Sequence, residues 1–308
     1  MLGGDVPSVD LAYLFSAPLV DRRKDNELKP LALLDIETER ELLLNVVRGC
    51  QRNVRFTEGV ATVRSVQDIF SRGLRALHYS GHGVKDAVTF ETGLSRDGDP
   101  TRAAEMHAVK GRELQKLIVA TNVTRHLKFV FVSACHSESV GQCFVDAGVD
   151  HVVCIDTDYG VLDTAAKVFC RSLYSALLVG HTVRSAFDTA VQTVRMEPAL
   201  KSGGAIEAAK FKLLPENRER GGAARDECNG PPTDQHAVAI FAHLESTGDA
   251  SLASLNARAL YNDVPRPVPY FGSRVKVRAC VVVLRLSFPR ASHPPPPTRS
   301  PSTARSRA

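Results

Sequence analysis

Two residues with complementary chemistry stand where two apolar runs end. Residues 76–83 (ALHYSGHG) bring His82 to a turn, and residues 127–137 (LKFVFVSACHS) do the same for Cys135. Each run predicts a buried strand that enters a turn. The loops that follow the strands of an open parallel sheet meet at one edge, where sites are built. A thiol and an imidazole at that edge make a candidate nucleophile and general base.

The same two stretches supply what acyl transfer needs besides the pair. The thiolate is the nucleophilic form of cysteine, and a nearby imidazole promotes its formation or takes the proton. The backbone N–H groups of Gly83 and Cys135 are predicted to stabilise a developing oxyanion. Glycine on both sides of His82 lets backbone and substrate approach closely. The alternative, a turn histidine between glycines and an unrelated buried cysteine, is less favoured because the two residues occur together in one sequence.

Two other histidines and two aspartates near the candidate pair are not predicted to take part in the proton transfer. His78 lies inside the first strand and is predicted to be a core residue. His136 follows Cys135 directly, and since adjacent strand residues point to opposite faces it is a poor base for the thiol. Asp156 and Asp158 follow the next strand on the same edge. Their carboxylates could select a basic substrate side chain by charge pairing; the alternative, which we favour, is a solvated turn or a helix cap.

Composition excludes several classes of protein. The 308 residues are 44% hydrophobic, and no apolar run reaches the roughly 20 residues of a membrane-spanning helix. The start of the sequence lacks a secretory signal, so we expect a cytoplasmic protein with reduced thiols. Seven cysteines form no CxxC and no zinc-like spacing, so neither a metal nor a cofactor is predicted.

The net charge of +5 is confined to the end of the sequence. Residues 285–308 contain five arginines and no acid, so the rest of the chain carries no net charge. Nucleic acid binding is therefore not expected except through this tail.

Strands alternate with helices along the chain. Strand patterns occupy residues 9–20, 53–57, 87–92, 151–155, 211–214 and 237–241, besides the two runs above, and helix patterns occupy 36–49, 63–75, 105–120, 139–147, 162–179 and 182–196. This alternation predicts an α/β fold with a mostly parallel central sheet and helices on both faces. Residues 96–100 and 216–235 read as exposed loops.

The domain boundaries follow composition. Residues 1–245 are predicted to form one domain, residues 246–272 a linker, and residues 273–308 a disordered tail rich in proline, arginine and serine.

The motifs YSGHG (79–83) and VSACHS (132–137), in this order and each on its own strand, resemble the CHAT domains, relatives of the caspases, separases and gingipains. The resemblance covers roughly residues 11–241. It implies a caspase-like sandwich with a cysteine–histidine dyad, in which Cys135 is the nucleophile and His82 the base. CHAT domains are typically fused to regions that sense a signal, so regulatory sensor domains absent from this chain are expected partners.

Two functions remain open on the sequence. The first is a regulated cysteine endopeptidase that cleaves a protein or peptide substrate. The second is a non-catalytic caspase-like module that binds a partner protein in signalling or as a scaffold. The presence of both His82 and Cys135 favours the first.

Overall fold

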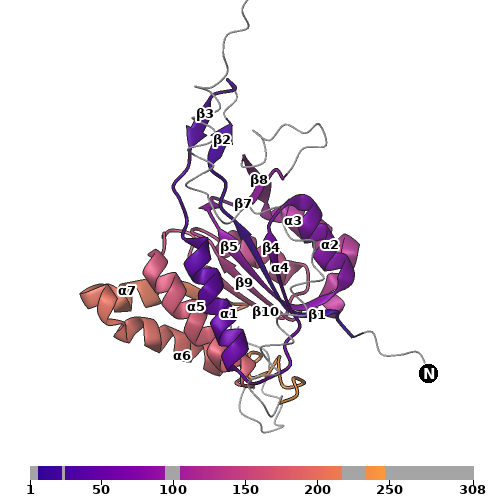
Figure 1. The fold of residues 1–308 in the computed structure, drawn as a ribbon, viewed down its shortest axis with the longest axis vertical. Coiled ribbons are helices and arrows are strands. Elements are labelled where there is room, and N and C mark those ends of the chain that lie inside the picture. Colours follow the sequence, from indigo (N-terminus) through magenta and orange to yellow (C-terminus); the bar gives the residue numbers. More distant parts are fainter. Residues whose placement is uncertain (1–5, 23–24, 94–104, 217–233, 247–308) are drawn as a thin grey trace, which may run out of the picture. The chain divides into compact units, whose positions relative to one another are not determined.

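A computed structural model describes residues 6–22, 25–93, 105–216 and 234–246 (Figure 1). These residues all belong to one compact unit, Met1–Pro265. The predicted linker at 246–272, apart from its first residue, and the tail at 273–308 lie outside the described residues. So do most of the two loops predicted at 96–100 and 216–235.

The centre of the fold is a six-stranded sheet in the order β11-β10-β9-β5-β1-β4. Its strands are β1 (Val9–Ser16), β4 (Phe56–Val60), β5 (Leu74–Gly81), β9 (Phe129–Ser133), β10 (His151–Ile155) and β11 (Phe211–Leu214). All neighbours pair in parallel except β10 and β11. Every residue of β1, β9 and β10 is buried, as expected for parallel strands covered on both faces. The predicted mostly parallel α/β sheet is confirmed.

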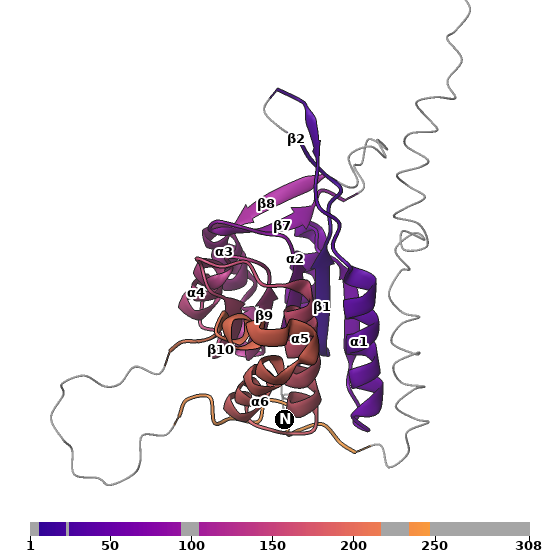
Figure 2. The ribbon, with the colours of Figure 1, turned by 90° about the vertical axis from the view of Figure 1, so that its left-hand side faces the viewer.

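Helices cover both faces of this sheet (Figure 2). The helices α1 (Ile36–Gly49), α5 (Asp163–Leu178), α6 (Val183–Met196) and α7 (Gly204–Ala208) lie on one side, and α2 (Val63–Arg72), α3 (Gly111–Thr121) and α4 (Glu138–Asp146) lie on the other. Short 3₁₀ turns precede α7 (Pro198–Gly203) and follow α3 (Val123–Arg125). Among the described residues, no helix is long and apolar enough to cross a membrane.

The helix ends follow local sequence. Asp35 begins α1 because its side chain accepts the Thr38 N–H, and Thr62 begins α2 by accepting the Ser65 N–H. Thr182 does the same for α6 through Ser185. The apolar stripe of α2, which includes Val66 and Phe70, packs into the core cluster between sheet and helices.

Two small β structures extend from the carboxyl end of the main sheet. One is the sheet of β6 (Gly83–Val84), β7 (Ala87–Glu91) and β8 (Met106–Lys110); the other is the hairpin of β2 (Val20–Arg22) and β3 (Leu28–Pro30), at the top of Figure 1. They place polar backbone and side chains around the edge where β5 and β9 end.

The sequence prediction was wrong in three places. The helix predicted at 105–120 is β8 followed by a shorter helix, because Met106–Lys110 pairs with β7 along its length. The strand predicted at 53–57 lies three residues later, as β4. Residues 237–241 form no strand: 237–239 are irregular, and 240–241 lie in a turn. This segment is held by the N–H groups of Val183 and Arg184, which donate to the carbonyls of Val238 and His236.

Candidate active site

The register of the two central strands brings His82 and Cys135 to the same place. β5 and β9 pair in parallel with Ser80 opposite Ser133, and each candidate residue follows its register partner by two positions. Paired strands lie about 4.8 Å apart, so the two turns begin side by side. Both residues are half-buried at the carboxyl edge of the sheet. The structure therefore places the predicted pair on adjacent turns of one edge.

Gly83 makes direct backbone contact with Cys135. A Cβ atom added at position 83 would overlap the carbonyl oxygen of Cys135 and lie 2.9 Å from its nitrogen. Any side chain at position 83 would force the two turns apart. The Thr89 N–H donates to the His82 carbonyl at 3.2 Å, so the next pair of this ladder, Gly83 and Val88, is a non-hydrogen-bonded pair. The N–H of Gly83 consequently points away from β7.

The imidazole of His82 is held from one side by the segment before α1. Its Nε2 lies 2.9 Å from the carbonyl oxygen of Ala32. A carbonyl oxygen only accepts, so Nε2 carries the proton and donates it. In the neutral ring Nδ1 is then the basic nitrogen, available to a neighbouring group.

The turn that carries Cys135 is fixed by Ser137. The buried Ser137 hydroxyl donates to the Val132 carbonyl at 3.0 Å and accepts the Ile155 N–H at 2.9 Å, which ties the ends of β9 and β10 together. The loop after β10 closes over the thiol, since a Cβ added to Gly160 would lie 3.5 Å from Cys135 Sγ.

No hydrogen bond joins the His82 ring to the Cys135 thiol among the described residues. Catalytic hydrogen bonds are often long in the absence of substrate and tighten when it binds. His136, next in sequence, has a φ of 57° and donates Nδ1–H to the Thr157 carbonyl at 2.6 Å. Its ring is thus engaged with the loop after β10.

The two acidic residues of that loop differ in their surroundings. Asp156 is mostly buried and occupied: its carboxylate accepts the Asp158 N–H at 3.0 Å and lies 3.3 Å from Lys212 Nζ. Asp158 is exposed. Neither side chain caps α5, which begins after Leu162 without a side-chain cap. The helix-cap alternative for these residues was therefore wrong, and the solvated-turn alternative describes the exposed Asp158 but not the mostly buried Asp156.

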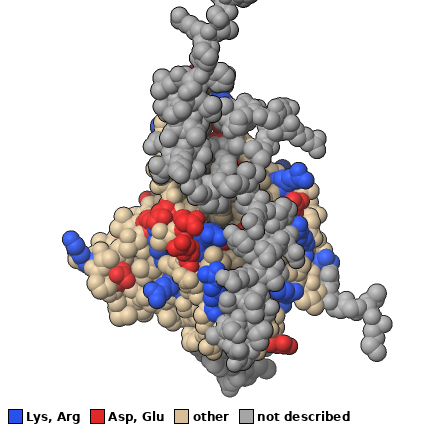
Figure 3. Space-filling model, in the orientation of Figure 1, with Lys and Arg blue, Asp and Glu red and all other residues tan. Residues whose placement is uncertain are grey.

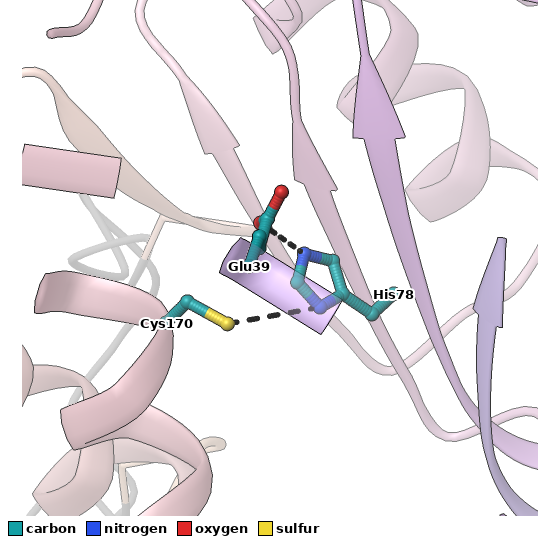
Figure 4. A group of neighbouring side chains, drawn as sticks. All are labelled: Glu39, His78 and Cys170. Atoms are coloured by element: carbon teal, nitrogen blue, oxygen red, sulfur yellow. Dashed lines mark hydrogen bonds and ion pairs between the residues drawn. The ribbon is translucent and has the colours of Figure 1, made fainter. Parts of the chain in front are cut away.

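A second histidine and cysteine meet in the core: His78 was predicted to lie there, but its contact with Cys170 was not predicted. His78 Nε2 lies 3.5 Å from Glu39 Oε1, and His78 Nδ1 lies 3.8 Å from Cys170 Sγ (Figure 4). All three side chains are buried. Burial lowers the pKa of His78 to about 3 and raises that of Glu39 to about 7.

These three residue types can ligate a metal ion, and their ligand atoms lie within 4.8 Å of one another. However, Glu39 and Cys170 flank opposite nitrogens of the imidazole (Figure 4), whose lone pairs point in different directions. One ion bound to His78 would meet only one of the two without rotation of a side chain. The arrangement instead forms a chain of polar contacts, Cys170 to His78 to Glu39.

The surface around α1 and α5 carries charges of both signs. Acidic side chains gather on the face shown in Figure 3. Near the starts of α1 and α5, the side chains of Asp35, Glu37 and Asp163 are each about half exposed or more. Lys167 lies between two of them, 2.7 Å from both Asp35 and Asp163. This ion-paired group joins the start of α1 to the start of α5.

Sequence comparison assigns the family. Residues 6–249 match the CHAT domain, which is well over half of the chain. The chain belongs to the CHAT domain family. The CHAT match and the parallel sheet flanked by helices together confirm the predicted caspase-like α/β fold.

Structure comparison finds solved structures that resemble this CHAT domain at low sequence identity. The arginine-specific cysteine proteinase gingipain R (RgpB) has 11% identity and a TM-score of 0.42, covering 68% of this chain and 46% of that one. The complex of RgpB pro- and mature domains from Porphyromonas gingivalis has 13% identity and a TM-score of 0.42, covering 68% and 48%. This chain therefore spans about half the length of these gingipain structures.

A pyridoxal kinase from Staphylococcus aureus has 8% identity and a TM-score of 0.25, covering 59% of this chain and 85% of that one. None of the curated proteins compared with the CHAT domain matches it.

Sequence reasoning identified His82, Cys135 and Gly83 but missed the groups that hold them. Ala32 acts through its carbonyl, which every residue type possesses, so no sequence pattern marks it. Ser137 was visible in the VSACHS motif but gave no sign of joining two strands. Glu39 stood among other acids at the start of a predicted helix, and its position on the apolar face was the only available signal.

Proposed function

We propose that this CHAT domain is a cysteine endopeptidase in which Cys135 is the nucleophile and His82 the general base. The observation that carries the proposal is the backbone contact between Gly83 and Cys135, which puts the two turns together at the sheet edge. The bond from His82 Nε2 to Ala32 supports the assignment, because it leaves Nδ1 as the basic nitrogen.

The chemistry follows the roles of these groups. His82 Nδ1 takes the thiol proton, and the Cys135 thiolate attacks the carbonyl carbon of the substrate peptide bond. The Gly83 and Cys135 N–H groups stabilise the oxyanion that forms. The imidazolium then gives its proton to the leaving amine as the C–N bond breaks. Water, deprotonated by the same imidazole, hydrolyses the thioester and restores the thiol.

The substrate in this proposal is a protein or peptide. Its preference for a basic side chain at the cleavage position would rest on Asp158, which is exposed, more than on Asp156, whose carboxylate already binds the Asp158 N–H and Lys212. We propose that the enzyme acts in the cytoplasm and is regulated by sensor domains outside this chain.

One observation favours a non-catalytic alternative, a signalling or scaffold module that binds a partner protein. Within the described residues, the His82 ring and the Cys135 thiol share no hydrogen bond. A module of this kind would keep the fold and the partner surface without needing the proton transfer.

A peptide-library cleavage assay read by mass spectrometry separates the two functions. The wild type is compared with Cys135→Ala and His82→Ala, and with Cys143→Ala as a matched control, since Cys143 is also a half-buried thiol but lies on α4 against Gly111. We expect cleavage by the wild type and the control and loss in the other two. Equal cleavage by all four proteins, or binding of a partner with no cleavage, would overturn the peptidase proposal.

A further inference from the structure

Two polar side chains stand on one face of β5, and a third follows the strand at the candidate site. His78 and Ser80 share a face because strand geometry puts every second residue on the same side, and His82 comes directly after the strand ends at Gly81. The first two contact Glu39 on α1, and the third contacts Ala32, which precedes α1. The end of β5 and the turn that carries His82 are therefore attached to α1 and its preceding segment at three alternate positions.

Glu39 is the common acceptor of this attachment. The Ser80 hydroxyl donates to Glu39 Oε2 at 2.5 Å, and the Tyr13 hydroxyl donates to the same oxygen at 3.5 Å. His78 Nε2 faces Oε1. The imidazole of His78 is itself stacked between Phe131 and Tyr174, with ring centroids 4.8 and 5.4 Å away, so it cannot turn freely.

A carboxyl group buried at position 39 lowers the stability of the fold unless its polar atoms find partners. Glu39 is 5% exposed, and burying a carboxylate disfavours its charged form. Among the described residues, no lysine or arginine side chain forms a hydrogen bond or ion pair with it. Buried polar groups with several partners fix one arrangement of the elements that carry them. Here those elements are α1 and the end of β5.

The segment from Ala32 to Glu39 transmits this arrangement to His82. Asp35 caps α1 through the Thr38 N–H and is held by Lys167 of α5 at 2.7 Å. The segment before α1 is thereby held at Asp35 by Lys167, and the first turn of the helix is held by the contacts of Glu39. The Ala32 carbonyl at its start then has a defined place against the His82 ring.

We propose that Glu39 is a positioning residue which, by anchoring α1 to Ser80 and His78, holds the Ala32 carbonyl against His82 Nε2. The proposal rests on the proposed function in that it assigns the reactive nitrogen of His82 to Nδ1. Glu39 does not touch the reacting atoms. Its effect is to select the tautomer and the orientation of the ring that does.

The test uses Glu39→Ala, the conservative Glu39→Gln, and Ser80→Ala, which removes one anchor without removing the carboxyl group. Asp10→Asn is the matched control, because Asp10 is a carboxylate that is 1% exposed at the amino end of β1, bound to Arg55 and His243. Nitrogen-15 NMR of the histidine rings reports which nitrogen of His82 is protonated, and circular dichroism checks folding.

We expect the wild type and Asp10→Asn to show the Nε2–H form of His82, and Glu39→Ala and Ser80→Ala to show a several-fold rise in the Nδ1–H form. Glu39→Gln, which keeps an acceptor for Ser80, should restore most of the wild-type pattern. With a cleaved substrate, kcat should fall about ten- to a hundredfold in the two disrupted variants while KM is unchanged.

If Glu39→Ala does not fold, Ser80→Ala decides. A wild-type tautomer and kcat in the folded variants would overturn the positioning role. Metal analysis is a second check: if the purified wild type contained one equivalent of zinc and Cys170→Ser contained none, Glu39, His78 and Cys170 would be a metal site, and the positioning role would be overturned. The NMR result does not require peptidase activity. An inactive wild type whose tautomer still responds to Ser80→Ala would refute the proposed function and leave the positioning role intact.

Discussion

Replacing Glu39 by glutamine should change how the stability of the protein depends on pH. Glu39 is buried, and burial raises its pKa from the ordinary 4.5 to about 7. Between these two values the folded protein keeps the proton that the unfolded chain has lost. The free energy of unfolding therefore gains a contribution at low pH that disappears as the pH rises through 7. Glutamine does not titrate, so the variant lacks this contribution.

The size of the effect follows from the two pKa values. With 4.5 in the unfolded chain and about 7 in the folded protein, linkage gives a change of about 2–3 kcal/mol in the free energy of unfolding between pH 5 and pH 8. The wild type loses this amount relative to Glu39→Gln as the pH rises. Any constant difference in packing between carboxyl and amide cancels in this comparison.

Urea unfolding followed by circular dichroism at pH 5 and pH 8 measures the effect. Asp10→Asn is again the control. The partners of Asp10 hold its pKa below 3.8, so its contribution to the free energy of unfolding is lost as the pH falls through the acid range, whereas that of Glu39 is lost as the pH rises. Its difference from the wild type should change by much less than that of Glu39→Gln between pH 5 and pH 8, because its histidine partner His243 is about one-third exposed and its charge is screened by water. Parallel curves for the wild type and Glu39→Gln would refute the reasoning about Glu39.

Three further predictions concern other parts of the fold. Gly83→Ala should abolish cleavage and change alkylation of Cys135 in a folded protein, because a Cβ at position 83 overlaps the Cys135 carbonyl; unchanged rates would contradict this contact. Burial lowers the pKa of His151 to about 4 and lowers that of His236, and the two Nδ1 atoms lie 2.9 Å apart, so stability present above pH 6.5 should be lost as the pH falls toward 4. Hydrogen exchange, corrected for intrinsic rates, should show residues 234–246 losing protection in this range, and pH-independent protection would speak against the pair. Phe131→Ala, in the fully buried β9, should cost about 3–5 kcal/mol in urea unfolding; a loss under 1 kcal/mol would mean that the strand does not lie in the core.

The central part of the fold could be predicted because its strands are simple in sequence. β9 (FVFVS) and β10 (HVVCI) are almost wholly apolar, and β5 (LRALHYSG) is buried at every position but Arg75, as parallel strands covered on both faces require. Their order along the chain, with a helix between each, led to the parallel arrangement. His82 and Cys135 were found because each comes directly after such a run, where a parallel sheet builds its sites.

The small sheet beside the site could not be predicted in the same way. Met106–Lys110 is a short strand whose pairing with β7 is a long-range contact, and its sequence runs without a break into the helix Gly111–Thr121. The residues of this strand were therefore predicted as the first part of the helix. Residues 237–241 are apolar because Ile240 and Phe241 pack into the core from a turn, which periodicity does not distinguish from a short strand.

The support of the candidate site was hidden for a different reason. The Ala32 carbonyl, the Glu39 carboxyl and the Ser137 hydroxyl act from other elements or through the backbone. They come close to the turns that carry His82 and Cys135 only when the sheet is assembled. The spacing of residues in the sequence does not predict these long-range contacts.

The most direct test of the account is the rate at which iodoacetamide alkylates each cysteine at neutral pH, followed by mass spectrometry of the peptides. It needs no knowledge of the substrate. If His82 activates Cys135, this thiol should react at least about tenfold faster than the half-buried Cys143 and Cys50, and His82→Ala should remove the difference. Equal rates for the three thiols, or a Cys135 rate that His82→Ala leaves unchanged, would contradict the dyad.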